Sequence, residues 1–79
     1  MTIYILTRIN EDYEVLATKA YLTLAEAQAV MRKEYEAERS CFYTEDSLRG
    51  SEIQDRYARV NYGDCYFYDW TITQTELAI

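Results

Sequence analysis

The segment TLAEAQAVMRKEYEAER, residues 23–39, decides the fold because it predicts one amphipathic helix in a chain that elsewhere alternates in the manner of strands. It opens with a capping box: the Thr23 hydroxyl can accept from the Glu26 amide while the Glu26 carboxylate returns to the Thr23 amide. From position 24 onward nearly every residue is a good helix former. The apolar stripe that this helix must bury consists of Leu24, Ala27, Met31 and Tyr35.

Two predicted hairpins flank the helix. The first pairs strands at 2–9 and 13–18, and the second pairs strands at 53–62 and 65–73, with Gly63 supplying the positive φ of a tight turn. Residues 40–51 lack periodicity and form a long connection. The order β-β-α-β-β predicts a single α+β domain over residues 1–79, in which one helix covers one face of a four-stranded, mostly antiparallel sheet.

Alternation along each strand predicts which side chains meet the helix. We expect these to be Ile3, Ile5 and Ile9 in the first strand, Ala58, Val60 and Tyr62 in the third, and Tyr66, Tyr68, Trp70 and Ile72 in the fourth. The opposite face would then carry Tyr4, Leu6, Tyr57 and Phe67. Left open to water, such a patch would mark an interface. The alternative is that these side chains pack on each other or beneath the loop around Cys41.

Composition narrows the classes of partner. The chain has nine tyrosines, no histidine, no proline and a net charge of −6. Tyrosine is enriched where proteins touch each other, whereas the acid excess argues against direct binding of nucleic acid or of an anionic membrane. No stretch approaches the length of a membrane span. The two cysteines, Cys41 and Cys65, are expected to be unpaired in a reducing cytoplasm.

The sequence contains no catalytic, zinc-binding or phosphate-binding motif. Without histidine, proton transfer near neutral pH would need a strongly shifted carboxylate, tyrosine or thiol. Two isolated thiols cannot build a zinc site, and two glycines thirteen residues apart cannot form a phosphate loop. We therefore predict no catalytic residue, no metal site and no cofactor, and we expect that the chain is not an enzyme.

These exclusions leave a protein that acts by binding another protein, one with a basic surface. In size, charge and lack of motifs the chain resembles the phage-borne anti-CRISPR and anti-restriction proteins. That resemblance implies a stoichiometric inhibitor occupying the nucleic-acid-binding cleft of a defence nuclease in the host cytoplasm. No motif carries over a functional residue, so the predicted contacts rest on acids grouped with aromatics. They are Tyr4, Phe42, Tyr43, Glu45, Asp46, Tyr57, Phe67 and Asp69.

The alternative is a homodimer with a regulatory or ligand-holding role. In that case two copies would associate through the open sheet face or through an edge strand, and the marginal size of the core motivates this reading.

Overall fold

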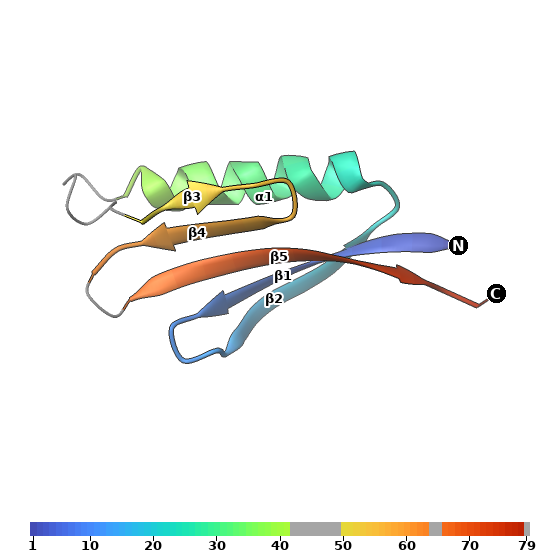
Figure 1. Ribbon diagram of the computed structural model, residues 1–79, viewed down its shortest axis with the longest axis horizontal. Helices are drawn as coiled ribbons and strands as arrows, with labels where there is room; N and C mark the ends of the chain where they lie inside the picture. The colour runs from blue at the N-terminus through green and yellow to red at the C-terminus, as the bar shows by residue number, and fades with distance from the viewer. Residues whose placement is uncertain (42–49, 64–65, 79) are drawn as a thin grey trace.

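One helix lies along one side of an antiparallel sheet in the computed structural model, which describes residues 1–41, 50–63 and 66–78 (Figure 1). Within those ranges the elements are β1 (Thr2–Asn10), β2 (Val15–Tyr21), α1 (Leu24–Arg39), β3 (Glu52–Ile53), β4 (Tyr57–Asn61) and β5 (Phe67–Glu76). The sheet order is β2-β1-β5-β4-β3, with every neighbouring pair antiparallel. The α+β class and the single helix on one face are confirmed for these residues.

The sheet has five strands where the sequence predicted four. The expected strand at 53–62 is a small hairpin, in which β3 turns back on β4 with Ile53 opposite Ala58. The Gln54 amide donates to the Tyr57 carbonyl at 2.7 Å and closes the turn. That turn contains neither glycine nor proline, so the sequence lacked the residues that most often mark a turn. The last strand reaches Glu76, beyond the predicted end at 73, because it pairs along the whole length of β1.

The predicted helix is confirmed from its cap to its last turn. The Glu26 amide donates to the Thr23 hydroxyl at 3.1 Å, as predicted. The Glu26 carboxylate accepts from the Thr23 hydroxyl at 3.0 Å, where the capping box predicted the Thr23 amide as its donor. The side chains of Ala27, Met31 and Tyr35 are buried, and Leu24 packs at the margin of the core. The helix therefore presents the stripe that its sequence pattern indicated.

The prediction of which β1 side chains meet the helix is wrong. The two faces of the strand are exchanged, as they would be by a shift of one residue. Leu6 lies opposite Ile72 and Arg8 lies opposite Trp70, so the even-numbered residues of β1 share the helix-covered face. Ile3, Ile5 and Ile9 lie on the other face. Both alternating sets of β1 contain apolar side chains, and pairing with β5 rather than hydropathy selects the inner one. The core consists of Leu6, Ala27, Met31, Tyr35, Ala58, Val60, Trp70 and Ile72.

Arg8 closes the core at its edge, although it is charged. Its guanidinium lies 4.4 Å from the centre of the Tyr68 ring and 5.0 Å from that of Trp70. It forms ion pairs with two carboxylates of α1, at 2.7 Å to Glu38 and 3.8 Å to Glu34. Contacts with these two rings and two carboxylates stabilise an arginine at a position where a hydrophobic residue would otherwise be expected. No described helix is both long and apolar enough to span a bilayer.

Candidate protein-binding surface

The residues predicted to contact a partner are only partly brought together. Tyr57, Phe67 and Asp69 lie on the open face of the sheet, on β4 and β5. Tyr4 does not join them, because the register of β1 turns it to the helix-covered face, where it packs against the core. The other predicted contacts lie outside the described residues: Phe42, Tyr43, Glu45 and Asp46.

A hydrogen-bonded polar network lies on this open face between β4 and β5. Arg59 donates two hydrogen bonds to Asp69, Nε to Oδ1 at 2.6 Å and Nη2 to Oδ2 at 2.9 Å, and the Tyr57 hydroxyl donates to the same carboxylate at 3.3 Å. The hydrogen bond to Asp69 raises the pKa of Arg59, and burial followed by the Asp69 charge raises the pKa of Tyr57. The bidentate pair makes this part of the face neutral and holds the guanidinium 4.1 Å from the centre of the Phe67 ring.

The turn between β1 and β2 displays a tyrosine among three acids. The Asn10 side chain accepts from the amides of Asp12 at 3.0 Å and Glu14 at 3.1 Å, which organises the turn. The Tyr13 amide donates to the Asn10 carbonyl at 2.9 Å, and Tyr13 takes a φ of 60°, a conformation uncommon for residues other than glycine. The residue stays 74% exposed, flanked by Asp12 and Glu14 with Glu11 just before. A strained backbone thus presents an aromatic ring to solvent.

Further aromatic rings lie beside this turn. The Tyr13 ring meets the Phe67 ring edge-on, with centroids 6.3 Å apart. On the helix side, the ring of Tyr62 stacks between those of Tyr66, at 5.8 Å, and Tyr68, at 5.1 Å. The Tyr62 hydroxyl donates to Glu11 at 3.4 Å, so it ties this group to the turn. Burial, with Tyr68 and Glu11 as further causes, raises the pKa of Tyr62 to about 12.

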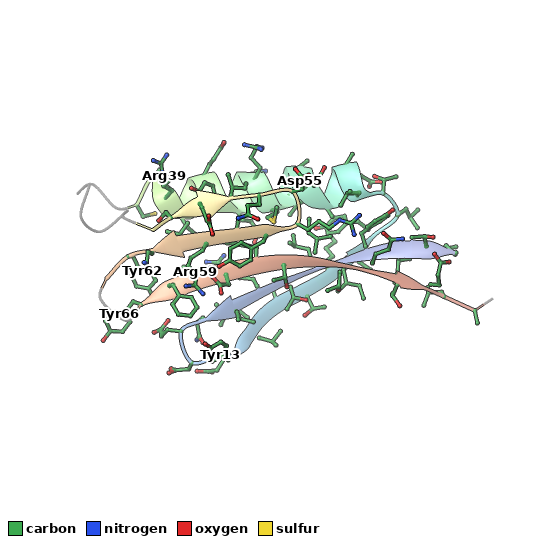
Figure 2. The ribbon with its side chains drawn as sticks, viewed as in Figure 1. Tyr13, Arg39, Asp55, Arg59, Tyr62 and Tyr66 are labelled. Carbon is green, nitrogen blue, oxygen red and sulfur yellow. The ribbon has the colours of Figure 1, made fainter. Side chains whose placement is uncertain are left out.

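We call this region the acidic aromatic end. It comprises Glu11, Asp12, Tyr13, Glu14, Tyr62, Tyr66 and Phe67. Figure 2 shows Tyr13 at the tip of the β1–β2 hairpin and Tyr62, Tyr66 and Arg59 at the same end of the sheet. Rings supply stiff contact area and the acids supply charge, which is the combination suited to docking on a basic protein surface.

Sequence reasoning missed most of this end, although one signal was available. The run Glu11-Asp12-Tyr13-Glu14 places an aromatic ring inside an acidic turn. The sequence could not show that Phe67 lies against that turn, because 54 positions separate it from Tyr13 (67 − 13). Tyr62 and Tyr66 were assigned to the core, yet Tyr66 is 54% exposed.

The described ranges contain no cluster of side chains of the kind that binds a metal ion. Residues 1–41, 50–63 and 66–78 contain no group of three or more candidate metal-ligating side chains. Cys41 is exposed, forms no disulfide with any residue in those ranges, and donates through Sγ to the Ala37 carbonyl at 3.3 Å. Cys65 lies outside them. Comparisons with protein-family models, with curated proteins and with solved structures found no match for this chain.

Proposed function

We propose that this protein acts by binding a second protein through the acidic aromatic end, and that its partner presents a basic surface. The observation that carries the proposal is Tyr13, held at a φ of 60° and 74% exposed in a turn with three acids. A non-glycine residue in that conformation costs stability, of order 1–3 kcal/mol. Its edge contact with Phe67 returns about 0.5–1.5 kcal/mol. Glycine would fill this position at lower cost, so the ring supports a role in binding rather than in folding.

The neighbouring side chains fit the anatomy of a binding hot spot. Tyrosine and arginine are the residues that most often dominate binding energy, and they do so when packing fixes them before the partner arrives. The Phe67 ring contacts the Tyr13 ring edge-on and also contacts the guanidinium of Arg59. Hydrogen bonds to Asp69 hold that guanidinium in position. Glu11, Asp12 and Glu14 surround these rings with negative charge, and none of them forms an ion pair with a basic residue in the described ranges. That charge would steer a basic partner toward the rings.

A basic surface that accepts acids and stacked rings is also a surface that accepts nucleic acid. We therefore propose, as the finer form of the same function, a stoichiometric inhibitor that occupies the nucleic-acid-binding cleft of a defence nuclease or related enzyme. In that arrangement Glu11, Asp12 and Glu14 would stand in for phosphates, while Tyr13 and Tyr66 would stand in for unstacked bases. The net charge of −6 supports this form.

Site-specific photo-cross-linking tests the location of the surface. A benzophenone amino acid replaces Tyr13 in one variant and Lys33, exposed on α1, in a matched control. We expect a cross-linked partner at position 13 and none at position 33. The opposite pattern would show that the helix, and not the acidic aromatic end, makes the contact.

Competition tests the finer form. The partner captured at position 13 is purified and titrated with this protein in the presence and absence of its own DNA or RNA. Nucleic acid should displace the protein, and affinity should fall as salt rises because the acids lose their steering effect. If the partner binds nucleic acid and this protein together without mutual loss of affinity, the inhibitor mechanism is excluded while the binding surface stands.

A further inference from the structure

A second surface carries no charge at all. On the open face of β2, β1 and the C-terminal part of β5, the registers bring together ten side chains. Nine of them are β-branched. We call this set the threonine–isoleucine face, and its members are Ile3, Ile5, Thr7, Ile9, Val15, Thr18, Ala20, Thr71, Thr73 and Thr75.

No described segment covers this face. The helix lies on the other side of the sheet (Figure 1), and along β5 the buried Ile72 alternates with the exposed Thr71 and Thr73. Val15 remains 64% exposed at the rim. Strands with apolar side chains on both faces, as β1 has in Tyr4 and Leu6 on one side and Ile3 and Ile5 on the other, are typical of sheets with both faces covered. The sequence of β1 therefore suits a strand that has a second layer packed against it.

Charge indicates which molecule could supply that layer. Each copy of this chain has a net charge of −6, so two copies repel wherever their acids oppose each other. The carboxylates of the helix and of the β1–β2 turn lie outside the threonine–isoleucine face. Two copies that meet through this face place no acid against another acid. A basic partner would find no carboxylate here to bind.

The size of the face sets the strength of such a contact. β1 has nine residues, so the face is about 30 Å long, and three strands spaced about 4.8 Å apart make it about 14 Å wide. The flat area is therefore about 400 Å² per copy, or about 800 Å² in total. Specific interfaces of this size are at the weak end of the range. The contact should be reversible and dependent on concentration.

We propose that a second copy of this chain covers the threonine–isoleucine face, giving a two-fold symmetric dimer in which the two sheets pack face to face. Such a pair would form a β-sandwich with a helix on each outer side. The surface differs from the acidic aromatic end, so this inference does not depend on the proposed function.

Sedimentation of the purified chain over a range of concentrations tests the proposal. We expect a species of twice 9.4 kDa to form with a dissociation constant of about 10 µM or weaker. A chain that is still monomeric at about 1 mM would overturn the proposal, since a specific contact of this kind should be populated there.

Charged variants at the centre of the face locate the contact. Thr73 is exposed and lies beside Ile5, which in turn lies beside Ala20. Thr73→Glu and Thr73→Lys should each weaken the dimer at least about 100-fold, because an unpaired charge would be buried. Using both signs matters: a purely electrostatic association of acidic chains would be strengthened by lysine. The matched controls are Gln74→Glu and Gln74→Lys on the opposite face, which should change the constant less than about threefold.

Two further measurements keep the proposal falsifiable if a charged variant folds poorly. Thr73→Val, which preserves shape and adds apolar surface, should keep or strengthen the dimer. Hydrogen exchange then distinguishes a dimer formed through the threonine–isoleucine face from a dimer formed through the edge strand β2. Amides of β2 that point away from β1 should exchange at the same rate in monomer and dimer. Protection of those amides on dimerisation would show that the second copy extends the sheet at its edge, and the face-to-face arrangement would be wrong.

Discussion

Replacing Arg8 tests the feature of the fold that departs most from the sequence pattern, a charged residue on the inner face of a central strand. Arg8→Ala removes a guanidinium whose side chain is 19% exposed. Its hydrogen bond to Glu38 at 2.7 Å is a charged one, which contributes about 1.5–3 kcal/mol when buried. The contacts with Tyr68 and Trp70 add about 0.5–1 kcal/mol each.

Partial exposure of the two acids reduces that sum. The side chains of Glu38 and Glu34 are 28% and 36% exposed, so solvent screens their attraction to Arg8. We expect Arg8→Ala to lower the free energy of unfolding by about 2–4 kcal/mol. For a chain of 79 residues each kcal/mol corresponds to about 6 °C in Tm, so the loss should be about 12–24 °C.

Arg8→Met separates packing from charge. Methionine keeps an apolar stem against the two rings and removes the guanidinium, and replacing a buried ion pair by apolar groups is often nearly neutral. We expect it to cost about half as much as alanine. The assay is urea unfolding followed by the fluorescence of Trp70, the single tryptophan, which lies beside Arg8.

Arg32→Ala, at an exposed position of α1, is the matched control and should change stability by less than about 0.5 kcal/mol. An equally small effect of Arg8→Ala would refute the reasoning. It would mean that Arg8 points to water and that Ile3 and Ile5, rather than Leu6, meet the helix.

Three other changes have defined outcomes. Met31→Ala, at a residue that is 1% exposed, should lower the free energy of unfolding in urea by about 2–5 kcal/mol, against less than about 1.5 for Met31→Leu. Thr23→Ala should cost about 0.5–2 kcal/mol through loss of the helix cap, with a matching loss of helical circular dichroism, and an unchanged Tm would contradict the cap. Folding raises the pKa of Tyr62 from 10.0 to about 12, so the unfolded chain loses the phenol proton first. Stability should therefore be constant up to about pH 10 and fall as pH rises toward 12, and Tyr62→Phe should flatten that fall.

The candidate site was predictable only in fragments. Tyr57, Phe67 and Asp69 were assigned to one face of one hairpin, and the structure places them there because alternation within two neighbouring strands is a local property. Tyr4 was assigned to the same face and lies on the other. The reason is that β1 reaches β5 across the chain, and nothing near Tyr4 in the sequence sets that register.

The helix and its cap were determined by sequence alone. Every signal for α1 lies within four residues of the group it affects: the Thr23 hydroxyl and the Glu26 amide, then the recurring apolar positions. These signals are local in the sequence, so they can be recognised without knowing any tertiary contact. For that reason the predicted and observed bounds of the helix agree.

Only tertiary structure decided which face of β1 is inside and which rings gather beside the acidic turn. Both alternating sets of β1 contain apolar residues, so hydropathy could not choose between them. The choice depends on Arg8, whose burial is acceptable only because Glu34 and Glu38 arrive from a helix about thirty positions away, with rings from β5. The position of the exposed Tyr13 ring likewise depends on its contact with the Phe67 ring. A buried charge and an exposed ring both depend on partners that are distant in sequence, and folding alone brings those partners together.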